Sequence, residues 1–286
     1  MSREETDMHT FQTPGPVRLR VEIPKGRVHV TAAQVSETTV ELTAMNGDAT
    51  ALAWIAEAEV AQRGEEIVVL VRKHGLAFFG VGGAIEATIR VPVASSADLS
   101  TGSGRIITQG RLGDVRAASG SGAVNLAEVA DVKARTGSGE IVVASASGSA
   151  DAKTGNGRVT IGKVGGDARI ATGSGHAELA SAAGEAHLTT GSGNIEVGDA
   201  GDSLQAFAAS GRIRVRRADH GRVKAKSISG SVSVGVAEGS AAWLDLSTVS
   251  GKVRSDLQSA GEPGPGEMTV ELRLETVSGN IEVQRA

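Results

Sequence analysis

The sequence contains no cysteine and no tyrosine, and its aromatic residues are limited to four phenylalanines and two tryptophans. The absence of cysteine excludes disulfides, thiol nucleophiles and cysteine-based zinc or iron–sulfur sites. Large aromatic side chains normally anchor a globular core. The core of this protein must instead be filled by valine, isoleucine, leucine and alanine, so we expect its layers to lie close together.

Long apolar runs are also missing. The longest stretch of apolar residues and glycine, 75–85, is far shorter than the roughly 20 residues that a membrane-spanning helix needs. The first seven residues, MSREETD, are acidic and lack the apolar segment of a signal peptide. We therefore expect a cytoplasmic location.

A short glycine-rich phrase recurs from residue 101 onward. It reads Thr or Ser, Gly, Ser or Asn, Gly, and its last glycine falls at positions 104, 122, 139, 157, 175 and 193. Degenerate copies begin at residues 210, 229, 250 and 278. A unit of about 18 residues cannot bury its own apolar face, so a repeat of this length predicts stacked coils.

An alternating run of apolar and polar residues follows each phrase. The apolar positions expected in the core include Ile141, Val143, Val159, Ile161, Ile195 and Val197. The positions between them, expected to face outward, include Arg158, Thr160, Asn194 and Glu196. This period of two predicts strands with one buried face.

The fold class that these patterns predict is all-β, a parallel β-solenoid, or β-helix, with coils of about 18 residues. The crossover rule favours a right-handed coil. The Thr/Ser column is expected to form a hydroxyl ladder at a corner, where the glycines supply positive φ angles.

Residues 1–95 lack the repeat and are expected to form a β-rich N-terminal cap, continuous with a solenoid over residues 96–286. The expected strands are 17–23, 26–31, 39–44, 67–73 and 85–93. A helix is predicted over 48–58, with Asn46 or Asp48 as its cap. A Pro/Gly loop at 256–266 precedes two strands, 268–274 and 280–284, which we expect to cap the other end.

The iterated phrase, the segment AAWLDLST (241–248) and the terminal TVSGNIEV (276–283) together resemble one family. It is the bacterial "putative adhesin" family of β-strand-repeat proteins, a domain of unknown function. The resemblance covers nearly the whole chain. It implies a parallel β-solenoid without known enzymatic activity, brings no catalytic residues, and points to a setting related to envelope stress.

Chemical motifs are scarce. Each glycine-rich phrase opens a strand rather than a helix, which argues against nucleotide-binding loops. No Gly-x-Ser-x-Gly nucleophile elbow occurs, and the six histidines lack metal-ligand spacing. One outward patch combines acids with bases, and we interpret it as cross-strand ion pairing: Glu140, Glu178, Glu196, Arg158 and His176. We therefore predict no catalytic, cofactor or metal site.

One coil is strongly basic. Residues 212–226 contain seven basic side chains and one acid, Asp219. The basic residues are Arg212, Arg214, Arg216, Arg217, Arg222, Lys224 and Lys226. Such a band suits an anionic polymer, a phospholipid headgroup or a nucleic acid. We favour pairing with Glu196, Asp199 and Asp202 of the preceding coil, and the lack of stacking aromatics disfavours nucleic acid.

The segment HGLAFFGVGG (74–83) places Phe78 and Phe79 together at a predicted hairpin tip. An exposed apolar tip indicates a contact with a partner or a membrane. The other interpretation is that both rings fold back and plug the end of the solenoid. The sequence leaves both open.

The function that we expect is a non-enzymatic, adhesin-like scaffold or interaction protein without cofactor or small-molecule substrate. A protein partner is favoured, and an anionic polymer or membrane surface is the second choice. The alternative is a binder of, or an enzyme acting on, an anionic polymer or polysaccharide along the solenoid face.

Overall fold

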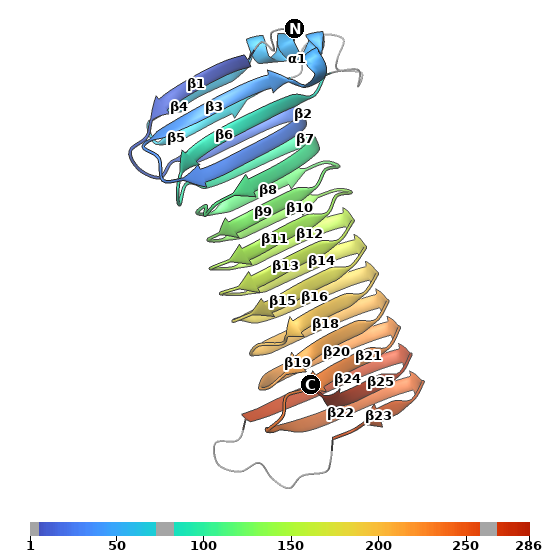
Figure 1. Ribbon diagram of the computed structural model, residues 1–286. Coiled ribbons are helices and arrows are strands. Elements are labelled where there is room, and N and C mark those ends of the chain that lie inside the picture. The colour runs from blue at the N-terminus through green and yellow to red at the C-terminus, as the bar shows by residue number, and fades with distance from the viewer. Residues whose placement is uncertain (1–5, 73–82, 258–267) are drawn as a thin grey trace. The chain divides into compact units, whose positions relative to one another are not determined.

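The computed structural model describes residues 6–72, 83–257 and 268–286, and consists of strands with one short α-helix (Figure 1). The chain divides into two compact units, Met1–Ala144 and Ser145–Ala286. Strand β11 (Ile141–Ala146) lies across this division. No described helix has the length and apolar character needed to cross a membrane.

The first unit begins with a mixed sheet and continues into parallel coils. Its strands are β1 (Thr6–Gln12), β2 (Arg18–Ala33), β3 (Glu37–Ala44), β4 (Glu59–Arg63), β5 (Glu66–Leu70), β6 (Ile85–Pro92), β7 (Ser96–Gln109), β8 (Val115–Ser119), β9 (Val124–Val129) and β10 (Val132–Thr136). Strand β2 pairs in parallel with β7 along nearly its whole length, and β7 pairs with β8 and β9. Strands β1, β3 and β4 add antiparallel pairs. The N-terminal segment thus contributes a strand in register with the repeat, and a domain boundary at residue 95 stays a prediction.

The predicted helix is present as α1 (Ala49–Ala56), two residues shorter at its C-terminal end than expected. Its cap is Asp48, whose carboxylate accepts hydrogen bonds from the backbone N–H groups of Thr50 and Ala51. Trp54 and Ile55 bury their side chains beneath the helix. The two strands expected at 17–23 and 26–31 are one strand, β2, and β1 and β4 match no expected strand.

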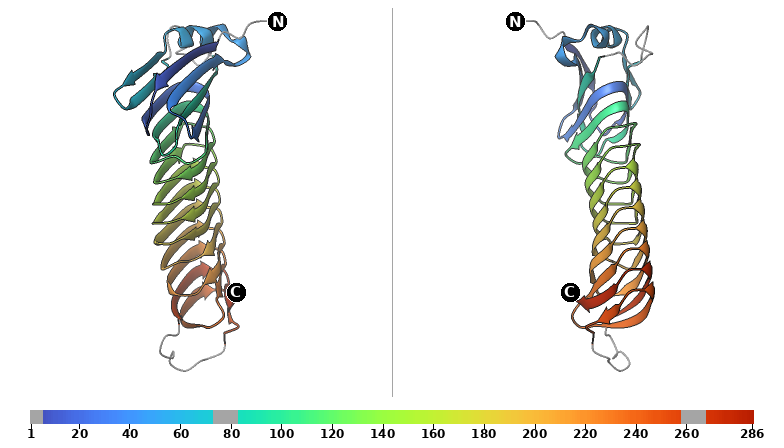
Figure 2. Two further views of the ribbon diagram at one scale, coloured as in Figure 1. Left: turned by 60° about the vertical axis from the view of Figure 1, so that its left-hand side comes forward. Right: turned by 90° about the vertical axis from the view of Figure 1, so that its right-hand side faces the viewer.

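The second unit is built from repeated pairs of strands that stack one above another (Figure 2). Its strands are β12 (Ala150–Asn156), β13 (Val159–Val164), β14 (Ala168–Ser174), β15 (Ala177–Ala182), β16 (Glu185–Ser192), β17 (Ile195–Asp199), β18 (Ser203–Ser210), β19 (Ile213–Ala218), β20 (Gly221–Ser229), β21 (Val232–Val236), β22 (Ser240–Ser250), β23 (Val253–Ser255), β24 (Met268–Ser278) and β25 (Ile281–Arg285). Even-numbered and odd-numbered strands form two parallel stacks, as in the pairs Ile170↔Leu188 and Val159↔Ala177. The predicted β-solenoid is therefore confirmed.

The core of this unit lies between the two stacks and is aliphatic. All six apolar positions predicted for the core are buried, four of them in this unit and two, Ile141 and Val143, in the first unit. The four polar positions predicted between them reach solvent. The alternation of apolar and polar residues in the sequence therefore correctly predicts which side chains of each strand are buried and which reach solvent.

A hydroxyl-to-carbonyl contact joins successive coils at the corner. The Thr172 hydroxyl is buried and donates to the carbonyl oxygen of Gly157, one coil earlier, at 3.1 Å. The Thr190 hydroxyl makes the same bond to Gly175 at 3.1 Å. The column is thus a set of inward hydroxyl donors to backbone, rather than a ladder of hydroxyls that bond one another.

The corner glycines are required mainly by this close stacking. A Cβ added to Gly175 would lie 1.9 Å from the carbonyl oxygen of Gly157, the same atom that Thr172 contacts. Positive φ angles, which we expected at the corner glycines, occur at Gly193, Gly211, Gly230 and Gly279 but not at Gly137 or Gly173. The expectation was wrong there because the distance between coils, rather than the backbone conformation, excludes a side chain.

The last strands of the chain are not the last in space. Strands β24 and β25 pair with β20 and β21 on one side and with β22 and β23 on the other. The expectation that residues 268–284 cap the end was therefore wrong, because residues 240–255 occupy that place. The inner position suits β24 and β25 since they bury Val270, Leu272, Leu274, Ile281 and Val283.

The buried rows generate a first prediction. Replacing Leu188 with Asp places a charge in the dry core and is expected to lower the free energy of unfolding by about 4 kcal/mol. Replacing the neighbouring outward residue, Thr189, with Asp is the matched control, with an expected change within about 0.5 kcal/mol. Urea unfolding midpoints measure both. Equal losses would mean that the two residues share a face, against the register described above.

The corner contact generates a second prediction. Gly175→Ala is expected to cost about 3 kcal/mol, because the backbone must move away from the Gly157 oxygen. Thr172→Val removes one hydrogen bond without changing the shape and is expected to cost about 1 kcal/mol. Ser174→Ala, at an exposed position of the same corner, serves as the control. If Ser174→Ala were as damaging as Gly175→Ala, close stacking would not explain the glycine.

Candidate interaction surface

The basic band consists of the seven basic residues of 212–226 and lies on β19 and β20, one strand in each stack. Core residues such as Val215 and Val223 are buried between the exposed basic side chains. Arg216 and Arg217 are both exposed because the register shifts between Val215 and Ala218, so Ala218 takes the next core position. A strictly alternating strand would have turned Arg217 inward.

Two residues of the band pair with acids on or next to their own coil. Arg216 lies 3.3 Å from Glu196 of the preceding coil, as predicted, and Arg217 lies 3.5 Å from Asp219 of its own coil. The other two acids expected to pair with the band do not do so. Asp199 accepts a hydrogen bond from the backbone of Gly201, and Asp202 contacts His220.

Two further pairs reach the coil that follows in space. Arg222 lies 2.8 Å from Glu271, and Lys226 lies 3.1 Å from Glu275. Both acids are on β24, which the sequence order does not place beside β20. Hydrogen bonds and charges from Lys226 and Arg273 hold the pKa of Glu275 below its ordinary value. Four of the seven basic residues are therefore neutralised by neighbours.

The remaining three basic residues, Arg212, Arg214 and Lys224, form no ion pair within the residues that the structure describes. All three are exposed. Arg212 and Arg214 belong to the β19 side, whereas Lys224 belongs to β20 in the other stack. The free charge of the band is thus split between two faces of the coil.

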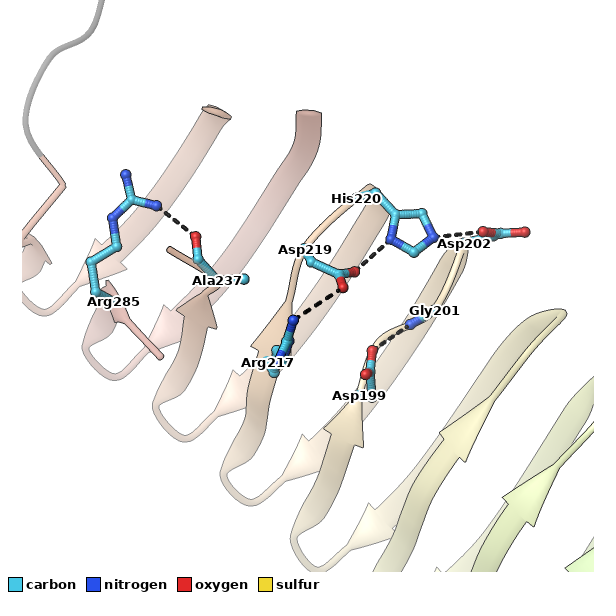
Figure 3. A network of polar contacts seen from close by, with 8 residues as sticks. All are labelled: Asp199, Gly201, Asp202, Arg217, Asp219, His220, Ala237 and Arg285. Atoms are coloured by element: carbon cyan, nitrogen blue, oxygen red, sulfur yellow. Dashed lines mark hydrogen bonds and ion pairs between the residues drawn. The ribbon is translucent and has the colours of Figure 1, made fainter. Parts of the chain in front are cut away.

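A histidine network joins two successive turns beside the band (Figure 3). The His220 imidazole contacts Asp219 through Nδ1 and Asp202 of the preceding turn through Nε2, the latter at 2.8 Å. The hydrogen bonds to Asp202 and Asp219 raise the pKa of His220 above its ordinary value, against the opposing effect of burial. Sequence reasoning missed this network, although His220 and Asp202 are 18 residues apart, one repeat length.

Asp219 is the most enclosed member of the network. Burial alone would raise its pKa, but the hydrogen bond and charge of His220, with a contribution from Arg217, outweigh burial and lower the pKa below its ordinary value. When protonated, the imidazole between two carboxylates acts as an electrostatic bridge between coils.

The other candidate residues do not assemble into a reactive site. His176 accepts a hydrogen bond from the backbone of Asn194 through Nδ1, and Glu178 lies beside Glu196 in the register of β15 and β17. Within residues 6–72, 83–257 and 268–286 no group of three potential metal ligands occurs. Phe78 and Phe79 lie outside the described residues, so both interpretations of that tip stay open.

The network predicts that its contribution to the stability of the protein is lost both at high pH and at low pH. Because the pKa of His220 is raised, its contribution to stability is complete below the pKa of free histidine and is lost as the pH rises through the His220 pKa. Because the pKa of Asp219 is lowered, its contribution is lost as the pH falls through that value. NMR titration of the His220 ring is expected to give a pKa above that of free histidine.

Asp202→Asn should move the His220 pKa toward that of free histidine. Asp199→Asn is the matched control, since that carboxylate bonds to Gly201 and leaves the ring unaffected. A His220 titration that is unchanged in Asp202→Asn would contradict the bridge between the two turns.

Several solved structures match this chain over nearly its whole length. A "putative adhesin" of Parabacteroides merdae is 11% identical, with a TM-score of 0.47, and the match covers 98% of this chain and 97% of that one. A "putative adhesin" of Bacteroides fragilis is 13% identical, with a TM-score of 0.40 and coverage of 99% and 98%. A "putative lipid binding protein" of Parabacteroides distasonis is 9% identical, with a TM-score of 0.38 and coverage of 98% and 96%.

No curated protein sequence matches this chain. A family model does match, from residue 19 to residue 284, and so spans both the mixed sheet and the stacked coils. The chain belongs to the Toastrack family, DUF4097.

Proposed function

We propose that this Toastrack chain is a non-enzymatic, adhesin-like scaffold whose outward strand faces bind a protein partner. The observation that carries the proposal is the pairing of outward charges between coils, as in Arg216 with Glu196 and Lys226 with Glu275. Such pairing neutralises four of the seven basic residues of the band and leaves a regular face with a reduced net charge. A face of this kind suits a complementary protein surface better than a flexible polyanion.

The core supports the same proposal. The coils are held by parallel backbone pairing and buried aliphatic rows, so neighbouring outward side chains keep fixed positions along each stack. Fixed, repeated positions allow many weak contacts to act together without ordering the scaffold on binding. A cytoplasmic location and the envelope-stress setting implied by the family resemblance stay predictions.

Photo-crosslinking tests the proposal in cells of the native host. A photoreactive residue in place of Thr189, which faces outward on β16, is expected to give a discrete adduct with one protein. The same residue at Leu188 is the buried control and should give none. If crosslinkers at Thr189 and at Glu178, one on each stack, both yield no discrete adduct, the scaffold proposal fails.

A second candidate function, binding of an anionic polymer, is favoured by one observation: no acid of the described residues pairs with Arg212, Arg214 or Lys224. If they form such a site, heparin should bind at low salt, and changing all three to Ser should reduce the slope of log K against log salt by about 3. Heparin affinity measured by titration calorimetry at several salt concentrations checks this.

Changing Arg216, Arg222 and Lys226 to Ser removes the same charge from paired positions and is the matched control. An equal loss in both triple variants would indicate a general charge effect rather than a site. No heparin binding at low salt would remove this candidate function.

A further inference from the structure

The end coil, formed by β22 and β23 (residues 240–255), has an open edge. Strand β22 pairs with β24 and β23 pairs with β25, and within the described residues no strand pairs with their other edges. The backbone N–H and C=O groups along one side of this eleven-residue strand are thus paired with no strand of the described residues. A long, free strand edge is a template for pairing with another chain.

The apolar core is open at the same place. The Leu244 side chain continues the inward row of Leu272, and Val253 continues that of Ile281. Leu272 and Ile281 are fully buried, whereas Leu244 is 38% exposed and Val253 is 44% exposed. The end coil therefore presents a cross-section of the core that no described residue covers.

Outward apolar side chains add to this surface. Trp243 is 68% exposed and Val249 is 81% exposed. A hollow of about 620 Å³ is lined in part by Trp243, Leu244, Val270 and Leu272. Of the eight large apolar residues that are exposed in the described chain, seven fall between residues 228 and 277. Such a concentration marks an interaction surface.

The composition of the free edge favours pairing with another strand. Strand β22 has none of the usual protective features, since it contains no proline or lysine and its single charge is Asp245. An edge of this composition is suited to being paired.

We propose that the end coil binds the end coil of a second copy of this chain, by antiparallel pairing of β22 with β22 across a two-fold axis at Leu246. In this register Trp243 lies opposite Val249, and Leu244 lies opposite Thr248. Asp245 lies opposite Ser247, so the strand's single charge meets a hydroxyl rather than another carboxylate. Side chains that face the core in one copy lie opposite side chains that face the core in the other. The exposed ends of the two apolar cores therefore pack against each other.

The pattern of β22 favours a second copy over an unrelated partner. A two-fold interface requires that each residue suit its mate at the same distance on the other side of the axis. The sequence WLDLSTV (243–249) meets this requirement, with the two bulky outward residues at its two ends and Leu246 at its centre. Registers centred one residue away place Asp245 against itself or against Val249, and both are unfavourable.

Sedimentation velocity over a concentration series tests the dimer. The wild-type chain is expected to shift from monomer to dimer with rising concentration. Leu246→Arg brings two like charges face to face at the axis and should leave only monomer. Met8→Arg is the matched control, because Met8 is an exposed apolar residue on β1 of the first unit, and its change should leave the dimer intact.

Cysteine crosslinking tests the register and does not depend on Leu246→Arg folding. The chain has no native cysteine. Directly opposed residues of an antiparallel pair lie about 4.5–5.5 Å apart between Cα atoms, within the range of a disulfide. Leu246→Cys alone should therefore form a dimer under oxidation. Asp245→Cys alone should not, but should crosslink when mixed with Ser247→Cys.

A wild-type chain that stays monomeric at all concentrations would overturn the proposal and leave the end coil to a different partner. A dimer in which Asp245→Cys crosslinks to itself would overturn the register. A dimer that persists in Leu246→Arg and is lost in Met8→Arg would place the interface elsewhere.

Discussion

The stacking of this protein depends on one contact that is repeated at the corner of successive coils. A buried hydroxyl of one coil donates to a glycine carbonyl of the coil before it, and a glycine Cα of the same corner packs against the same oxygen. The donors and acceptors are Ser119 with Gly104, Thr136 with Gly122, Thr172 with Gly157, Thr190 with Gly175, Ser227 with Gly211, and Thr276 with Gly230. The contact fixes which residues of adjacent coils face each other.

The register of the strands determines which side chains face the core and which face solvent. A slip of one residue would exchange the faces of every strand, burying charges and exposing the aliphatic rows. Because the register holds, outward charges of neighbouring coils meet as ion pairs and the inward rows form a narrow core without large rings. The same regularity leaves one edge of β22 and of β23 without a paired strand among the described residues. The apolar core at this end coil is likewise covered by no described residue.

The sequence predicts the repeated part of the structure well because its signals are local. The spacing of the glycines predicts the coils, the alternation predicts the buried rows, and Asp48 is one of the two residues predicted as the helix cap. The order of the last coils could not be predicted, because the Ser-Gly phrases at residues 229, 250 and 278 fit either order of stacking. What distinguishes the two orders is the number of buried apolar residues on β24 and β25, a property of packing.

The candidate surface was harder to predict for the same reason. The basic band was found from composition, but its pairing with Glu271 and Glu275 follows from the position of β24, which the chain order hides. The outward turn of Arg217 depends on a register shift that has no clear sequence signal. The bridge from His220 to Asp202 could have been found by aligning the degenerate turns one repeat apart.

A double-mutant cycle on Thr172 and Gly175 tests the central claim most directly, because both residues act on the carbonyl oxygen of Gly157. If a methyl group at position 175 pushes that oxygen away, the hydroxyl bond is already lost, and Thr172→Val should cost less in that background than in the wild type. We expect a coupling free energy of about 1 kcal/mol from urea unfolding. Additive losses, within about 0.3 kcal/mol, would contradict a shared corner contact.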